Sequence, residues 1–207
     1  MMKQDTKKYR HLKYLMFWPV YLMSFAVLER VFVHDYYHPV HCFIDDLIPF
    51  CEYFLIPYCL WFVELLAIQL YTLLYDIDEF KNFIKYLTIS FMGTLLIYII
   101  YPTCQEMRVE EYARSNIFTY LVQLIYSVDT NTNVCPSLHV IGAVAVMIST
   151  FRAKGLNKPL IRVGIAVLTI LISMSTVFLK QHSFVDVICA IPVCLITYMI
   201  IYRSYLF

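Results

Sequence analysis

Two short segments of the chain hold residue types that could transfer a phosphoryl group. The first, residues 135–139, reads Cys-Pro-Ser-Leu-His at the start of an apolar stretch. Proline there favours a helix that begins at this point. The backbone N–H groups of Ser137, Leu138 and His139 are then expected to point outward at the positive end of the helix dipole. Ser137 adds a hydroxyl donor and His139 a titratable ring, so this segment predicts a phosphate-binding site.

The second segment, residues 180–186, places a histidine and an aspartate four positions apart. On a helix, His182 and Asp186 would lie on one face. An aspartate that accepts the N–H of one ring nitrogen leaves the other nitrogen able to attack phosphorus or to take a proton. Lys180 could neutralise a phosphate oxygen, and Arg108 in the preceding long loop could bind phosphate in a bidentate manner.

Each of these residues also has a purely structural interpretation. A lone histidine near a membrane surface is usually structural, Asp186 could simply complement a helix dipole, and Lys180 could extend its amine from the membrane boundary into water. Chemistry is favoured because phosphate-type features from different apolar stretches are expected on one membrane face.

The composition predicts an integral membrane protein. The chain of 207 residues is 61% hydrophobic and only 15% charged, whereas soluble domains carry about a quarter of their residues as charges. This composition excludes fibrous and disordered classes. A net charge of +1 offers no electrostatic surface for DNA or RNA, so a nucleic-acid partner is not expected.

The elements that must position these residues are apolar stretches long enough to span a bilayer, which takes about 20 residues. Six stretches qualify, and they predict an all-α bundle of six transmembrane helices that occupies residues 1–207 as one domain, with a basic segment at 1–13. The expected spans are 14–33, 47–75, 83–102, 136–151, 160–179 and 184–202.

The distribution of basic residues predicts the orientation of the bundle. With the N-terminus inside, only four of the 16 Lys and Arg residues fall on the outer side: Arg30, Arg108, Arg114 and Lys180. Cytoplasmic loops are the ones that collect Lys and Arg. Both termini are therefore expected to be cytoplasmic, and the candidate site to lie on the extracytoplasmic face, most simply of a plasma membrane.

At these residues the sequence resembles a family. Pro-Ser-Leu-His at 136–139 and Lys-Gln-His-Ser-Phe-Val-Asp-Val at 180–187 are similar to the second and third signature motifs of the type-2 phosphatidic acid phosphatase superfamily. That superfamily contains lipid phosphate phosphatases and phosphotransferases. The resemblance implies six membrane helices, an active site at the membrane face and a reaction that needs no metal.

Carried over by residue, the resemblance implies a covalent mechanism. It makes His182 the nucleophile that forms a phosphohistidine, with Asp186 orienting its ring. It makes His139 the acid that protonates the leaving alkoxide, and it assigns phosphate binding to Ser137 and the adjacent backbone N–H groups, including that of Leu138.

Departures from the family pattern affect the expected phosphate clamp. Leu138 occupies the position of a family glycine, as it does in the branch that contains inositol-phosphorylceramide synthases. Thr176 stands where the third motif has an arginine, and the first motif keeps Arg108 but lacks its lysine. The resemblance therefore leaves Arg108 and Lys180 as the expected phosphate-binding cations.

The function predicted from the sequence is a lipid phosphatase that works without metal or other cofactor on a phosphorylated lipid from the outer leaflet, with the bilayer as its surroundings. One alternative is a lipid head-group phosphotransferase similar to inositol-phosphorylceramide or sphingomyelin synthases. A second, from another class, is a small anion transporter with Glu64 in its pathway, because an ionisable residue deep in a span is a functional candidate.

Two further features are open at this point. His34, His38 and His41 lie in a loop rich in possible metal ligands, but their spacing matches no recognised zinc pattern, and a solvated or entrance-shaping loop is favoured over a metal site. Cys104 and Cys135 flank the long polar loop and could pair, although spacing alone does not decide this.

Overall fold

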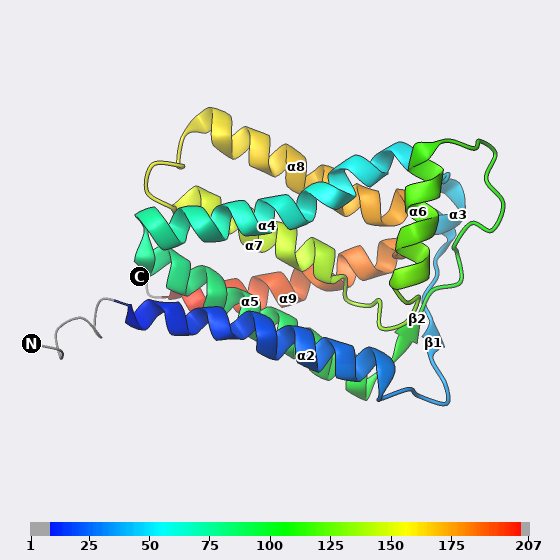
Figure 1. Cartoon of the computed structure of the whole chain (residues 1–207), viewed down its shortest axis with the longest axis horizontal. Helices are drawn as coiled ribbons and strands as arrows, with labels where there is room; N and C mark the ends of the chain where they lie inside the picture. Colours follow the sequence, from blue (N-terminus) through cyan, green and yellow to red (C-terminus); the bar gives the residue numbers. More distant parts are fainter. Residues whose placement is uncertain (1–8, 204–207) are drawn as a thin grey trace, which may run out of the picture.

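The computed structural model describes residues 9–203, and in this part the chain is a bundle of roughly aligned helices (Figure 1). Residues 1–8 of the expected basic segment 1–13 lie outside the described residues. The helices, in chain order, are η1 (Arg10–Met16), α2 (Phe17–Arg30), α3 (Phe43–Leu47), η2 (Glu52–Phe54), α4 (Leu55–Tyr75), α5 (Ile77–Ile100), α6 (Ile117–Val128), α7 (Leu138–Arg152), α8 (Pro159–Phe178) and α9 (Phe184–Tyr202).

Five helical segments are long and apolar enough to cross a membrane, and the fold is that of an integral membrane protein with five candidate spans. They are Arg10–Arg30, Glu52–Tyr75, Ile77–Ile100, Pro159–Phe178 and Phe184–Tyr202. The remaining expected span, 136–151, forms α7, whose 15 residues extend about 22 Å at helical rise, less than the roughly 30 Å hydrocarbon core.

Two other expected spans have different boundaries in the structure. The stretch 47–75 is divided: α3 ends at Leu47, and α4 begins only at Leu55 after a short 3-10 turn, because Pro49 interrupts helical pairing. The stretch 83–102 begins earlier, at Ile77, because Asp76 caps α5 by accepting from the backbone N–H of Glu79 (3.4 Å).

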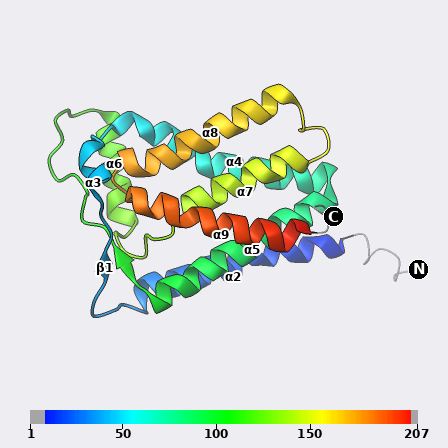
Figure 2. The same ribbon diagram turned by 180° about the vertical axis from the view of Figure 1, so that it is seen from behind.

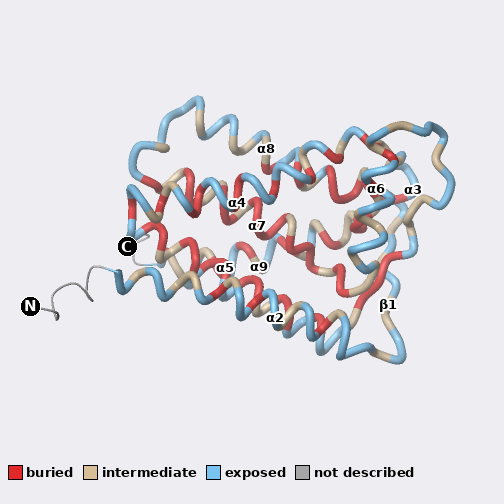
Figure 3. The backbone as a smooth tube through the Cα atoms, viewed as in Figure 1, coloured by how far each residue is buried: buried red, intermediate tan, exposed pale blue. Residues whose placement is uncertain are grey.

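Helix α7 lies at the centre of the bundle and packs against α4, α5, α8 and α9. Figure 3 shows the buried residues along α7 and the inward faces of its neighbours, whereas most outward faces are exposed. Small residues on α7 permit close packing, as is common in membrane bundles. At Gly142 a Cβ atom would lie only 2.7 Å from Nε1 of Trp61 on α4.

The two ends of the bundle differ in how their helices are connected. We call the end with the α4–α5 and α7–α8 connections the turn end, and the end with α3, α6 and the two short strands the loop end (Figures 1 and 2). At the loop end, β1 (His38–Pro39) pairs in parallel with β2 (Thr103–Cys104), and Cys104 also bridges to Thr132.

The long polar loop 103–135 contains a helix that the sequence analysis did not expect. Helix α6 crosses the loop end of the bundle (Figure 1). It begins where the Asn116 side chain accepts from the N–H groups of Phe118 (2.9 Å) and Thr119 (3.0 Å). Nearby, Glu29 at the end of α2 accepts from the side chains of Thr130 and Asn133, which fixes the segment leading to α7.

Candidate functional site

His182 and Asp186 meet at the start of α9. His182 Nδ1 lies 3.1 Å from Asp186 Oδ2, and the same oxygen accepts from the N–H of Ser183 (3.0 Å). Ser183 in turn caps α9 by accepting from the N–H of Val185 (3.1 Å). The contact predicted from the four-residue spacing is present, although His182 itself precedes the helix.

His139 approaches His182 from α7. The two ring centroids are 5.8 Å apart. Aromatic rings of α4 hold His139 in place, because the centroids of Tyr58 and Trp61 each lie 4.5 Å from its own. Within residues 9–203, His139 Nε2 is buried and has no hydrogen-bond partner, which is unusual for a buried polar atom.

The two histidines lie at one end of a cavity of about 810 Å³. Other buried polar atoms of residues that line it also lack partners in the described part of the chain: Trp61 Nε1, Asn133 Oδ1 and Gln181 Nε2. Buried polar atoms normally have partners in the protein or in water. We call this end of the cavity, whose lining residues contain buried polar atoms without partners, the cavity head.

The start of α7 forms one wall of the cavity head. Leu138 and His139 line the cavity, and among the described residues no acceptor bonds their backbone N–H groups. The Ser137 N–H is already used, because it donates to the Asp186 carbonyl (3.1 Å). Ser137 is completely buried and is not among the residues that line the cavity, and its hydroxyl has no partner within residues 9–203.

Arg108 lies next to the cavity head, and its two terminal NH2 groups both donate to the protein, whereas its Nε is buried without a partner within residues 9–203. Its guanidinium donates to the carbonyl oxygens of Tyr126 (3.0 Å), Asp129 (3.0 Å) and Thr130 (2.7 Å). It also donates to Gln181 Oε1 (2.7 Å). Burial lowers the pKa of Arg108 from its ordinary value. In this arrangement Arg108 ties the long loop to the residue before His182 and does not line the cavity.

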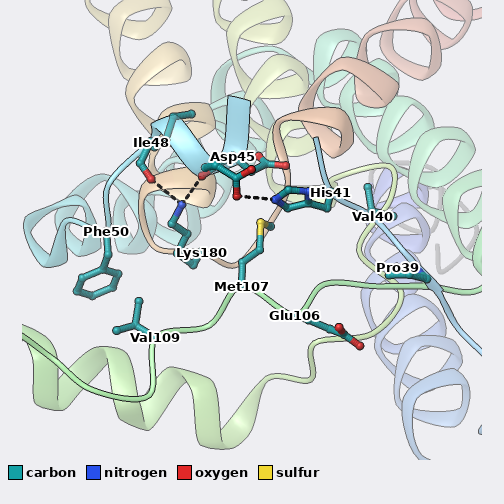
Figure 4. A pocket seen from close by; sticks show the side chains of 11 residues that line it. Pro39, Val40, His41, Asp45, Ile48, Phe50, Glu106, Met107, Val109 and Lys180 are labelled. Atoms are coloured by element: carbon teal, nitrogen blue, oxygen red, sulfur yellow. Dashed lines mark hydrogen bonds and ion pairs between the residues drawn. The ribbon is translucent and has the colours of Figure 1, made fainter. Parts of the chain in front are cut away.

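Lys180 points away from the histidines. Its ammonium donates to the carbonyl oxygens of Asp45 (2.8 Å) and Ile48 (2.6 Å), and it lines a separate pocket of about 600 Å³ (Figure 4). Burial lowers the pKa of Lys180, and the carboxylates of Asp45 and Asp46 oppose that shift. The structure therefore does not bring Lys180 to the cavity that contains His139 and His182.

Asp45 supports the site in a way that the sequence analysis missed. Its carboxylate accepts from the Ser183 hydroxyl (2.6 Å) and the N–H groups of Phe184 (2.7 Å) and Cys42 (2.8 Å). Burial raises the pKa of Asp45, but these hydrogen bonds outweigh burial and lower it overall. A carboxylate at a helix N-terminus is stabilising, so Asp45 fixes the start of α9, where His182 and Asp186 meet.

Asp129, also missed, contributes a carboxylate to the cavity lining. Burial raises the pKa of Asp129 above its ordinary value, whereas the charges of His182 and Arg108 act in the opposite direction. Tyr58 and Trp61 had no distinctive sequence signal, because an aromatic side chain in an apolar span looks like ordinary packing. Gln181 lies beside His182 in the second motif segment, but an amide there has no distinctive signal of its own. The hydrophilic run around Asp129 could have drawn attention to that residue.

The loop histidines do not converge on one another. His34 packs edge-on against Tyr37, His38 stacks on Tyr101 with centroids 4.1 Å apart, and His41 pairs with Asp46 (2.8 Å). In the described part of the chain no group of three or more His, Cys, Asp or Glu side chains could hold a metal ion.

The other open features also lie outside the cavity. Cys104 and Cys135 are both free thiols. Glu64 is buried in α4, and its carboxylate has no hydrogen-bond partner among residues 9–203. It does not line the cavity that contains the two histidines.

Comparison with protein-family models gives no match, and neither the curated proteins nor the solved structures contain a protein that this chain matches. The resemblance to the phosphatase superfamily therefore rests on the motif residues of the sequence alone.

Proposed function

We propose that this chain is an integral membrane lipid phosphatase that acts through a phosphohistidine intermediate. The observation that carries the proposal is the approach of the His182–Asp186 pair to His139 at the head of a largely apolar cavity. Nucleophilic catalysis needs a nucleophile that a neighbouring group orients, and phosphoryl transfer also needs an acid at the leaving oxygen. These side chains have the right chemistry for both requirements.

In the proposed first step, His182 Nε2 attacks phosphorus while its Nδ1–H is held by Asp186. The new N–P bond forms as the bond between phosphorus and the lipid oxygen breaks, and His139 gives that oxygen a proton. In the second step His139 takes a proton from water, whose oxygen attacks phosphorus and releases His182. The product is inorganic phosphate, and both histidines return to their starting states.

Charge on the phosphate oxygens would be stabilised mainly by the start of α7. The free N–H groups of Leu138 and His139 lie at the positive end of the helix dipole, and Ser137 offers a buried hydroxyl. Arg108 would contribute by exchanging its bond to Gln181 for one to phosphate, or through its Nε–H, which has no partner within residues 9–203. Lys180 is left out of the proposed clamp because its ammonium is bonded elsewhere.

The proposed placement in the membrane has six spans, with α7 as the short central one, both termini in the cytoplasm and the loop end on the extracytoplasmic face of a plasma membrane. Basic residues support it. Those at or near the turn end are Arg10, Lys13, Lys81, Lys85, Arg152, Lys154, Lys158, Arg162 and Arg203, against Arg30, Arg108, Arg114 and Lys180 toward the loop end.

The second candidate is a lipid head-group phosphotransferase, and the charge of the cavity lining favours it. Among the described residues no Lys or Arg lines the cavity, whereas Asp129 does. A phosphomonoester carries about −1.5 to −2 charges at pH 7, but a phosphodiester carries only one. A diester substrate is therefore easier to hold here, and Asp129 could accept the proton of an acceptor alcohol. The transporter alternative is less well supported because Glu64 is not part of this cavity.

The test is phosphate release by the detergent-purified protein from a panel of lipid phosphates with EDTA present. His182→Ala is compared with His41→Ala, a matched change at an exposed histidine outside the cavity. Release that survives EDTA and His41→Ala but is lost in His182→Ala supports the phosphatase. Head-group exchange without release, once a phosphodiester lipid and an alcohol are supplied, supports the phosphotransferase. Release that persists in His182→Ala contradicts the covalent mechanism.

A further inference from the structure

The cavity extends far beyond the space that a phosphate group needs. It follows one stripe of α4, from Tyr58 past Trp61 and Leu65 to Gln69, residues that share a face at three- and four-residue spacing. The eleven steps along the helix from Tyr58 to Gln69 correspond to about 16 Å at helical rise, roughly half the thickness of a bilayer core. The cavity is therefore as deep as one leaflet.

The opposite wall comes from α2 through Trp18, Tyr21, Leu22 and Phe25. Helix α2 packs on α5, and the cavity occupies the space between α2 and α4. Its rim is open toward the side of the bundle, because Leu22 and Phe62 are both 57% exposed and apolar. An apolar chain can therefore enter from the surrounding lipid without crossing a polar surface.

The end far from the histidines is closed by a polar contact. Trp18 Nε1 donates to Gln69 Oε1, which joins the two walls, and Gln69 is only 8% exposed. A chain that reached past this point would have to break the hydrogen bond and leave two polar atoms unpaired in apolar surroundings, which is unfavourable.

We infer that the cavity holds one hydrocarbon chain of the phosphorylated lipid and that the Trp18–Gln69 hydrogen bond sets the longest chain that fits. The inference rests on the proposed function, because it places the phosphate beside His139 and His182. The volume of about 810 Å³ lies within the range of about 300–1,000 Å³ for small-molecule sites. The apolar lining fits an alkyl chain, and burial alone gives no selectivity because lipid tails are equally apolar. Selection by length therefore depends on the Trp18–Gln69 hydrogen bond, which we call the polar stop.

The protein's two tryptophans allow a direct test of where the hydrocarbon chain lies in the cavity. Both line the cavity, Trp61 near the histidines and Trp18 at the closed end. In the His182→Ala background, Trp18→Phe and Trp61→Phe each leave one fluorescent reporter. Alkyl phosphates brominated beside the phosphate should quench Trp61, and those brominated at the tip should quench Trp18, saturably and reversibly by unbrominated competitor. Quenching that is not saturable, or that does not depend on bromine position, overturns the inference.

The length limit is tested by Gln69→Leu, with Thr72→Val as the matched control. Thr72 is buried one turn further along α4 but does not line the cavity. In Gln69→Leu, alkyl phosphates longer than the wild-type optimum should gain about tenfold in relative affinity, the factor expected for one buried hydrogen bond, whereas Thr72→Val should keep the wild-type profile. An unchanged profile in Gln69→Leu overturns the polar stop. Quenching that depends on bromine position, without turnover of any lipid phosphate, would instead contradict the proposed enzyme while supporting the binding of a hydrocarbon chain in the cavity.

Discussion

Both ends of the bundle bury hydrogen-bonded carboxylates, such as Asp45 and Asp186 at the loop end, but the loop end also contains the cavity head. At the turn end, Glu79 accepts from the Tyr202 hydroxyl (2.8 Å) and lies 3.7 Å from Arg152, and Asp76 accepts from the backbone N–H of Lys154 (3.0 Å). At the loop end, by contrast, the cavity head contains His139 Nε2 without a partner within residues 9–203.

This difference separates stability from function. A buried polar group that is fully hydrogen-bonded holds helices together, whereas one left unpaired is disfavoured in the empty protein and gains when a ligand binds. Variants at the turn end should therefore change stability, and variants at the cavity head should change activity.

The largest effect is expected from His139→Phe. The new ring can keep the packing against Tyr58 and Trp61 but cannot transfer a proton. Loss of a general acid typically lowers the rate by about 10²–10⁴-fold. The melting temperature should stay the same or rise, because a buried nitrogen without a partner is removed. Turnover and melting temperature in detergent measure the two effects, and a rate near the wild-type value would contradict the assigned role.

The second-largest effect is expected at the turn end, where a change should lower stability and leave turnover unchanged. Glu79→Ala removes one interaction of Tyr202 and one of Arg152. It should lower the free energy of unfolding by about 2–3 kcal/mol, less than for a fully buried pair because Arg152 is partly exposed. Turnover per folded molecule should remain at the wild-type level. Asp78→Ala is the matched control, since Asp78 forms only an exposed pair with Lys81, worth at most about 1 kcal/mol.

A third variant perturbs the histidine through its neighbour. In Gly142→Ala the new Cβ would lie 2.7 Å from Trp61 Nε1, so the indole that packs on His139 has to move. A small misplacement of a catalytic group costs about ten- to a hundred-fold in rate, and we expect the lower value. Gly93→Ala is the control, because no atom outside its own helix lies within 4 Å of its Cβ position. Equal activity in both variants would show that the position of Trp61 is unimportant.

Local sequence signals predicted much of the helical fold and the His182–Asp186 contact. Apolar runs indicated the long helices, and the i, i+4 spacing gave the pair because a capping box at Ser183 holds it. The same signals were less accurate for helix boundaries, as at Asp76, where a single capping residue extended α5 into an expected loop.

The remaining features depend on contacts between distant segments, which spacing does not reveal. The bonds of Arg108 to the carbonyls of 126–130 and of Asp45 to the start of α9 join residues far apart in the chain. Helix α7 is shorter than the helices that are long enough to cross a membrane. It lies in the centre of the bundle and is mostly covered by protein, a position that the sequence pattern does not reveal. The partners of Lys180 were equally unpredictable, since a basic residue beside a histidine looks the same whichever way it points.

The smallest effects are expected from changing one carboxylate at each end, Asp129 at the loop end and Asp76 at the turn end. Burial raises the pKa of Asp129, so between its unfolded and folded pKa values the folded protein binds more protons than the unfolded one. Its contribution to stability is fully present below the unfolded pKa and falls as pH rises through the folded pKa. Asp129→Asn should therefore be more stable than wild type at neutral pH, and this advantage should shrink on acidification. Asp76→Asn at the turn end should be less stable at neutral pH, because it weakens the bond to Lys154 and the cap of α5. Melting temperatures of both variants across the acidic range measure the contrast, and the same sign for both would contradict the distinction between the two ends.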